Sequence, residues 1–188
     1  MLSLLPAILF AIGILATLLH GRAVAATSGA SAWAFRHARG AQRTTGLAFA
    51  LSIAALAFGT ALLALGRIDP APAALFPGST IIAAGSLVVI AAQRQMGAAW
   101  RIGVRQGDAP LFVTAGLFRF SRNPVFVGMI AMAFGAALAL SALWAWLAAA
   151  VFAIACALQV RIEEAHLARE FGARYDDFRR ATPRWLVF

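Results

Sequence analysis

Long uninterrupted apolar runs are the feature that most constrains how this chain folds. Five of them are long enough to matter, and they cover residues 2–19, 46–65, 73–92, 124–140 and 143–160. A helix needs about 20 apolar residues to cross the hydrocarbon core of a bilayer. None of the runs alternates apolar with polar residues, as a half-buried strand would. The sequence therefore predicts an all-α, polytopic membrane protein with about five transmembrane helices.

Composition supports a membrane protein with one domain. Hydrophobic residues make up 62% of the 188 residues and charged residues only 12%, whereas a soluble domain carries roughly 25% charged residues. This length is typical of one domain. We therefore expect residues 1–188 to form a single membrane domain, with three transmembrane helices in residues 1–92 and the chemistry in residues 93–188. No basic residue precedes the first run, so we interpret it as an uncleaved helix rather than a signal peptide.

Two breaks in the apolar pattern predict local structure. The third run contains Pro77 and Gly78, so its first turns are expected to be kinked or interfacial. Only Ser141 and Ala142 separate the last two runs, which predicts a tight hairpin between them. The small residues Gly128, Ala131 and Gly135 would let the fourth helix pack closely on a neighbour.

The arginines predict the orientation. The chain has 16 basic residues, none of them lysine, and a net charge of +9. They follow the first, third and fifth runs, and only Arg67 follows the second. Because basic residues collect in cytoplasmic loops, the N-terminus is predicted outside and the C-terminus inside. Arginines beside membrane ends face anionic lipid head groups, so we expect the bilayer, and no nucleic acid, as the partner.

Metal-binding residues are too sparse for a metal site. Cys156 is the only cysteine and lies in the middle of the fifth run. The three histidines, His20, His37 and His166, are scattered without metal-ligand spacing. We therefore expect neither a metal nor a disulfide.

Polar residues gather on the predicted cytoplasmic side, in residues 93–103, 111–123 and 161–175. Asn123 is a favoured N-cap and Pro124 a favoured first helical residue, so a helix is expected to start there. This local role accounts for both residues. A functional interpretation builds on this role, because the free N–H groups and positive dipole of that helix start are suited to binding an anion such as a carboxylate.

Two adjacent glutamates follow the fifth run, on a helix that continues it. At about 100° per residue, one face of this helix contains Glu164, and Glu163 borders it. The other members of the face are Val160, Leu167, Phe171, Tyr175 and Phe178. One interpretation is an amphipathic helix at the cytoplasmic interface whose acidic residues pair with arginines. The other is a carboxylate at a membrane end that binds a cation. The periodicity leaves both open.

These segments carry two sequence motifs. The first reads Arg122-Asn123-Pro124-Val125-Phe126-Val127-Gly128, and the second has Glu163-Glu164, then Leu167, Phe171-Gly172, Tyr175 and Phe178, with Pro183-Arg184 closing it. Residues 96–185 thereby resemble the isoprenylcysteine carboxyl methyltransferase and phospholipid methyltransferase superfamily of integral membrane enzymes. The superfamily pattern has His and Tyr where this chain has Asn123 and Phe126. Asn cannot titrate near neutral pH, so no imidazole base exists there.

The resemblance implies S-adenosylmethionine as methyl donor, with S-adenosylhomocysteine as product, at the cytoplasmic face of a bacterial inner membrane. Glu163 or Glu164 would face its cationic groups, and the expected catalytic residues are Glu163, Glu164 and Arg101. The expected cofactor-binding residues are Gly116, Leu117, Phe118, Arg122, Asn123, Pro124, Phe126, Glu163 and Glu164. The expected substrate-binding residues are Arg94, Trp100, Arg101 and Met129.

The resemblance thus predicts a membrane methyltransferase that acts on a lipophilic small-molecule acceptor, such as a prenylcysteine-like carboxylate, a lipid amine or a thiol. One alternative is a sterol-reductase-like enzyme, which would use NADPH. Another is a non-catalytic small membrane transporter or assembly protein. Cofactor retention separates these three, because only the methyltransferase retains S-adenosylhomocysteine.

Overall fold

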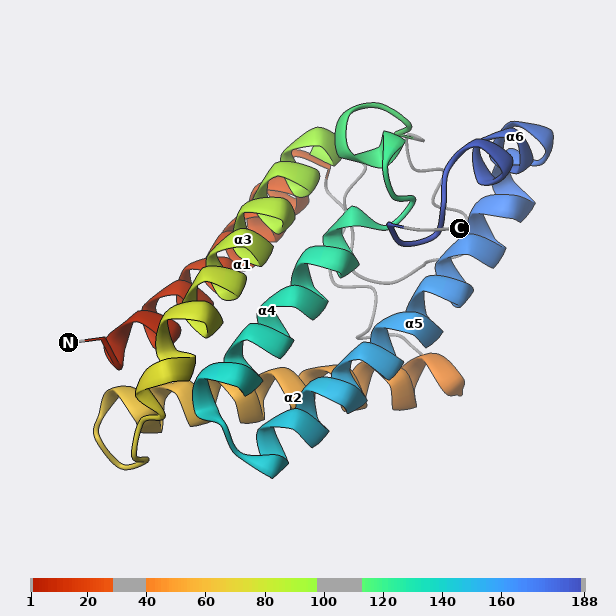
Figure 1. The fold of residues 1–188 in the computed structure, drawn as a ribbon. Helices are drawn as coiled ribbons and strands as arrows, with labels where there is room; N and C mark the ends of the chain where they lie inside the picture. Colours follow the sequence, from red (N-terminus) through yellow and green to blue (C-terminus); the bar gives the residue numbers. More distant parts are fainter. Residues whose placement is uncertain (1, 29–39, 98–112, 187–188) are drawn as a thin grey trace.

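The fold is a bundle of long apolar helices (Figure 1). The computed structural model describes residues 2–28, 40–97 and 113–186. Within these ranges the chain is helical, without strands, which confirms the all-α prediction. The elements are α1 (Leu4–Ser28), α2 (Ala41–Ala64), α3 (Pro72–Met96), the 3₁₀ helix η3 (Gly116–Arg119), α4 (Pro124–Leu140), α5 (Leu143–Phe171) and α6 (Ala173–Ala181).

Four of these helices, α1, α2, α3 and α5, are long and apolar enough to cross a membrane. Helix α4 is also apolar but has only 17 residues, at the lower end of the length that spans a bilayer. It lies between α3 and α5 (Figure 1), and most of its residues are buried against protein. The chain is therefore an integral membrane protein, in which the shortest of the five predicted spans is the most enclosed.

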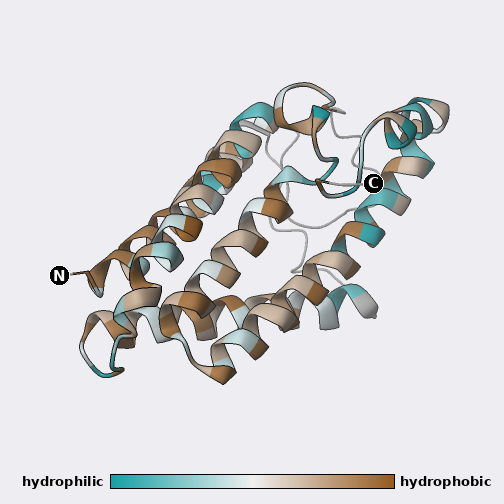
Figure 2. Ribbon diagram, viewed as in Figure 1, coloured by the Kyte–Doolittle hydropathy of each residue, from teal (hydrophilic) through white to brown (hydrophobic). Residues whose placement is uncertain are grey.

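The surface of the bundle matches a lipid environment. Large apolar side chains such as Leu51, Phe76 and Leu87 are exposed along the long helices. Hydrophilic residues gather around η3, α6 and the C-terminal end of α5 (Figure 2). Since lipid solvates apolar side chains and water solvates charged ones, this end of the bundle lies in or beside water.

The contact between α3 and α4 is made by glycines. A Cβ atom added to Gly85 would lie 2.6 Å from the carbonyl oxygen of Gly128, and one added to Gly128 would lie 2.6 Å from the oxygen of Gly85. Gly78 and Gly135 meet in the same way two turns away, with distances of 2.8 Å. The predicted close packing at Gly128 and Gly135 is confirmed. Helix α3 continues through Pro77.

Helices α4 and α5 form the predicted hairpin. Ser141 ends α4 in the left-handed conformation, with φ of 50°. Its N–H and its hydroxyl both donate to the carbonyl of Leu138, at 3.1 Å and 2.8 Å. Helix α5 then begins at Leu143. The tight turn places the far ends of the two helices side by side.

The helix carrying the two glutamates differs from the prediction in one respect. The expected continuous helix ends at Phe171, and α6 starts at Ala173. Gly172 between them has φ of 50° and ψ of −129°, a conformation that is essentially open only to glycine. The predicted buried face is nevertheless present, because Glu164, Tyr175 and Phe178 are all buried.

Candidate functional site

The predicted site residues fall into three groups. Most lie in η3, in the first turns of α4 or near the C-terminal end of α5, and so share the hydrophilic end of the bundle. Arg94 is exposed in the last turn of α3. Trp100 and Arg101 lie outside the described residues, so their predicted roles remain predictions.

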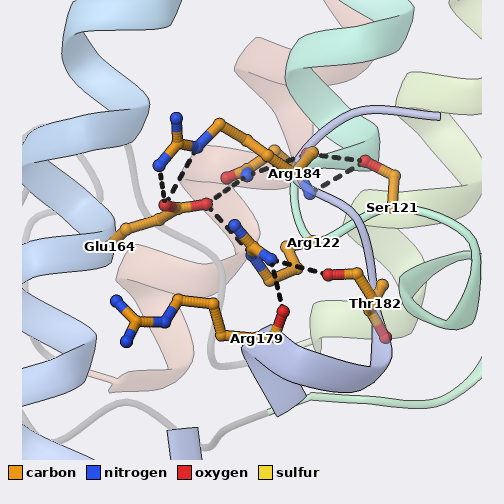
Figure 3. Close-up of polar contacts among 7 residues, drawn as sticks. Ser121, Arg122, Glu164, Arg179, Thr182 and Arg184 are labelled. Atoms are coloured by element: carbon orange, nitrogen blue, oxygen red, sulfur yellow. Dashed lines mark hydrogen bonds and ion pairs between the residues drawn. The ribbon is translucent and has the colours of Figure 1, made fainter. Parts of the chain in front are cut away.

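A buried ion cluster surrounds Glu164 (Figure 3). Its Oε1 accepts hydrogen bonds from Arg122 Nε and from Asn123 Nδ2, each at 3.1 Å. Its Oε2 accepts from Arg184 Nε at 3.0 Å and from Arg184 Nη2 at 2.8 Å. The side chains of Glu164 and Arg122 are both only 8% exposed. One carboxylate thus holds two guanidinium groups, and the cluster carries a net charge of +1.

The C-terminal segment, defined here as residues 182–186, closes over this cluster. Arg122 Nη1 donates to the carbonyls of Arg179 at 3.0 Å and Thr182 at 2.6 Å. The backbone N–H of Arg122 donates to the carbonyl of Pro183 at 2.9 Å. Figure 3 shows these groups converging from the start of α4, from the last turn of α6 and from the chain that follows it. Distant parts of the sequence are therefore joined at one buried arginine.

Asn123 stands where the N-cap of α4 was predicted, and its carbonyl accepts from Val127 N–H at 3.1 Å. Its side chain, however, makes no capping hydrogen bond. Nδ2 donates instead to the carbonyl of Arg184 at 3.2 Å, besides its bond to Glu164. Ser121 Oγ accepts from the Asn123 N–H and donates to the same Arg184 carbonyl, both at 3.1 Å.

The charges of the cluster are stabilised by their neighbours. The hydrogen bonds from Arg184 to Glu164 raise the pKa of the Arg184 guanidinium, so it stays protonated. Burial, followed by the negative charge of Glu164, raises the pKa of the Tyr175 hydroxyl to about 12. Tyr175 therefore stays neutral beside the cluster at physiological pH.

Glu163 differs from its neighbour in exposure and surroundings. It is half-buried, and its Oε1 accepts a hydrogen bond from Gln159 Nε2 at 3.0 Å, one helical turn earlier. Gln159 itself is buried. Glu164 has arginine donors on both oxygens, whereas this amide contributes no charge to Glu163. The two adjacent carboxylates thus differ in burial and in these partners.

The 3₁₀ helix η3 is fastened to α3 by a residue that the sequence analysis did not single out. The backbone N–H of Leu117 donates to Gln95 Oε1 at 2.8 Å. Gly116 has φ of 63°, and an added Cβ would lie 2.5 Å from the same oxygen. Phe118 is buried and Phe126 half-buried. Among the predicted cofactor residues, Phe118 thus belongs to the apolar core, and Leu117 and Phe126 pack against it.

Arg184, Ser121 and Thr182 were also missed as site residues. Arg184 had a signal, because Pro183-Arg184 closes the superfamily pattern. Ser121 and Thr182 had no such signal. Ser121 acts through its hydroxyl and Thr182 through its backbone carbonyl, and neither belongs to a recognisable sequence motif. No three His, Cys, Asp or Glu side chains gather as metal ligands within the described residues.

An apolar pocket lies deeper in the bundle. Its volume is about 150 Å³, and its lining comes from α1, α2, α4 and α5. The lining residues are Gly13, Ile14, Thr17, Leu18, Phe49, Ile53, Met129, Met132 and Phe152. The one hydroxyl in this wall is satisfied, because Thr17 donates to the Gly13 carbonyl at 3.0 Å and accepts from Gln93 Nε2 at 3.2 Å. Met129, a predicted substrate-binding residue, is part of the pocket.

Comparison with known proteins identifies the family. A family model described as phospholipid methyltransferase matches residues 73–174, which is more than half of the chain. No curated protein and no solved structure matches. The match spans α3, η3, α4 and α5, and it ends before the C-terminal segment that covers the ion cluster. The chain belongs to the phospholipid methyltransferase family, within the superfamily that also contains the isoprenylcysteine carboxyl methyltransferases.

Proposed function

We propose that this membrane methyltransferase uses S-adenosylmethionine to methylate a lipophilic acceptor. The observation that carries the proposal is that α4 joins a charged site to an apolar pocket. Arg122 and Asn123 precede its first residue, and Met129 lines the pocket. A helix rises about 1.5 Å per residue, so about 9 Å along the axis separates Asn123 from Met129.

The residues of the site fit the chemical groups of the cofactor. Its ammonium needs a carboxylate, and we assign this role to Glu163, because both oxygens of Glu164 are engaged by arginines. Its carboxylate suits the net positive charge of the cluster, in which the Arg184 side chain is 40% exposed. Leu117, Phe118 and Phe126 would cover the adenine. The bound cofactor would supply an electrophilic methyl group.

The chain's own contribution to methyl transfer is alignment and exclusion of water. An in-line displacement requires both more than it requires acid–base catalysis. A carboxylate or thiolate acceptor needs no base. An amine acceptor must be neutral, and Glu163 would take its proton. The amide at position 123 cannot serve as a base.

The pocket favours an acceptor with an apolar part. A dry apolar cavity of about this volume holds a benzene-sized group. The pocket wall offers two methionines, which adapt to irregular apolar shapes. An acceptor whose reactive group lies at the charged site would place the nearest part of its chain or ring here. Such a molecule is already concentrated in the bilayer, which explains why the enzyme is a membrane protein.

We further propose that the site faces the cytoplasm of a bacterial cell. Arginines follow the first, third and fifth predicted spans. In contrast, Arg67 is the only basic residue in the connection between α2 and α3, at residues 65–71. S-adenosylmethionine is a charged molecule and would reach the site from water. The lipophilic acceptor would reach it sideways from the bilayer.

Calorimetry with S-adenosylhomocysteine and turnover of labelled methyl donor test the proposal. The purified protein should retain S-adenosylhomocysteine and should methylate at least one of a panel of lipid amine, prenyl-thiol and small-thiol acceptors. Glu163→Ala should weaken cofactor binding at least tenfold, because a hydrogen bond to a charged group contributes about 1.5–3 kcal/mol. Glu170→Ala, which removes an exposed carboxylate of the same helix, is the matched control. Retention of a nicotinamide dinucleotide, or equal affinity in all three proteins, would refute the assignment.

A further inference from the structure

The side chain of Asn123 is used in an unexpected way. The residue occupies the N-cap position of α4, where an Asn side chain normally accepts a backbone N–H of the first turn. Here it makes no such bond. Its amide points instead to Glu164 Oε1 and to the carbonyl of Arg184. The residue therefore forgoes helix capping in favour of two contacts to other parts of the chain.

An amide is the chemical group that can make both contacts. Nδ2 carries two N–H groups on one atom, so it donates to two acceptors on the same side of the residue. A neutral imidazole has a single N–H donor, and a protonated imidazole directs its two donors to different sides and adds a charge. A histidine at this position therefore cannot reproduce both hydrogen bonds. The Asn in place of the superfamily's His is suited to joining Glu164 to the C-terminal segment.

These two contacts connect three separate elements. Asn123 belongs to the start of α4, Glu164 to α5, and Arg184 to the C-terminal segment. Glu164 in turn holds the side chains of Arg122 and Arg184. Loss of the amide would remove one donor from a buried carboxylate and one of the two side-chain donors to the Arg184 carbonyl. The other donor to this carbonyl is Ser121 Oγ.

We propose that Asn123 is a positioning residue that fastens the C-terminal segment to Glu164 and thereby completes the cytoplasmic wall of the cofactor site. The inference rests on the proposed function for what the site binds, but the fastening itself does not. It makes the C-terminal segment, which lies beyond the family match, a required part of the site. Because an amide does not titrate, Asn123 itself adds no pH dependence to the fastening. The charged and titratable groups that face it are Glu164, Arg122, Arg184 and Tyr175.

Asn123→Ala and Asn123→His test the inference, with Thr80→Ala as control. Thr80 also loses one side-chain hydrogen bond, to the Phe76 carbonyl, but at an exposed position of α3. Hydrogen exchange of the peptide covering residues 179–186 reports the fastening, and steady-state kinetics report the site. Asn123→Ala should accelerate exchange in this peptide and raise the KM for S-adenosylmethionine about tenfold, with a smaller change in kcat. Thr80→Ala should change neither.

The pH profile supplies a readout that a purely structural role would not move. Asn123→His should give kcat/KM a transition between about pH 5 and pH 8 that the parent lacks, because the imidazole titrates there. Asn123→Gln keeps both donors, so exchange in this peptide should be slower than in Asn123→Ala. If Asn123→Ala does not fold, Asn123→His, which cannot make both hydrogen bonds, should show the faster exchange in its place.

Parent-like exchange and a parent-like KM in Asn123→Ala would overturn the inference. Faster exchange together with a parent-like KM would overturn the link between the segment and the site. If the parent neither binds nor uses S-adenosylmethionine, the proposed function fails, while the exchange data still decide whether Asn123 fastens the segment.

Discussion

Gly85 and Gly128 bring the backbones of α3 and α4 so close that one added methyl group should force the helices apart. A Cβ on either residue would lie 2.6 Å from the carbonyl oxygen of the other. A carbon and a carbonyl oxygen normally approach to about 3.3 Å, so the helices would have to separate by about 0.7 Å. Backbone atoms of packed helices cannot rotate away from such a contact.

The expected destabilisation follows from two opposing effects. Inserting a methyl group into a packed interface costs about 1–3 kcal/mol. Replacing glycine by alanine in a helix favours the folded state by about 0.5–1 kcal/mol. Gly85→Ala and Gly128→Ala should therefore each lower the free energy of unfolding by about 0.5–2 kcal/mol. The double variant should cost less than the sum, because one separation relieves both contacts.

Gly13→Ala is the matched control. Its Cβ would lie 2.4 Å from Met132 Cε and 2.7 Å from Ser86 Oγ, which are ends of side chains that can change rotamer. Reversible unfolding in mixed micelles, followed by circular dichroism, measures the differences. Equal stability of Gly13→Ala, Gly85→Ala and Gly128→Ala would refute the argument that backbone contact limits this interface.

Four further predictions address the site and the topology. Glu164→Ala should lower stability by about 3–5 kcal/mol, since it leaves buried arginines without their carboxylate, and unfolding measurements that show less than 1 kcal/mol would contradict the buried cluster. Because the pKa of Tyr175 is raised to about 12 from an unfolded value near 10, the parent should lose stability as pH rises from about 10 to 12. Tyr175→Phe should not show this loss. If the free energy of unfolding falls equally with pH in the parent and in Tyr175→Phe, the prediction is refuted. As an acceptor series lengthens, the activation free energy for kcat/KM should fall by up to about 0.8 kcal/mol per methylene until the pocket is full. Met129→Trp should abolish this gain, and the lipid-facing Leu87→Trp should not. A reporter fused after Phe188 should be active in the cytoplasm and one inserted at residues 67–72 outside, and the opposite result would overturn the proposed orientation.

The helices were predictable because each apolar run is a local property of the sequence. The start of α4 at Pro124 and the hairpin at Ser141 follow from residue types with strong local preferences. The break at Gly172 was missed because a glycine within a periodic pattern does not say whether its φ will be positive. Close packing was predicted for Gly128, but its partner Gly85 was not predicted, because the partner of a small residue depends on which helices meet.

The site was less predictable than the fold, for reasons of chemistry. The pattern around Glu163 and Glu164 indicated that a carboxylate matters, but spacing cannot say which one is occupied by arginines. That depended on Arg122 and Arg184, which approach Glu164 from segments 42 and 20 residues away. Asn123 was predicted as an N-cap from its residue type, and tertiary contacts redirected its amide.

The two-residue turn after Leu140 joins α4 and α5 at one end, and the ion cluster joins them at the other. About 24 Å of helix separates Leu140 from Pro124, and about 12 Å separates it from Met132 in the pocket wall, at 1.5 Å per residue. Any change in the angle between the two helices therefore moves the pocket wall by about half as much as it moves the charged site. A rearrangement of Glu164 and its arginines would in this way be transmitted as a change in pocket width. Binding at the charged site and binding in the apolar pocket would then affect each other without direct contact.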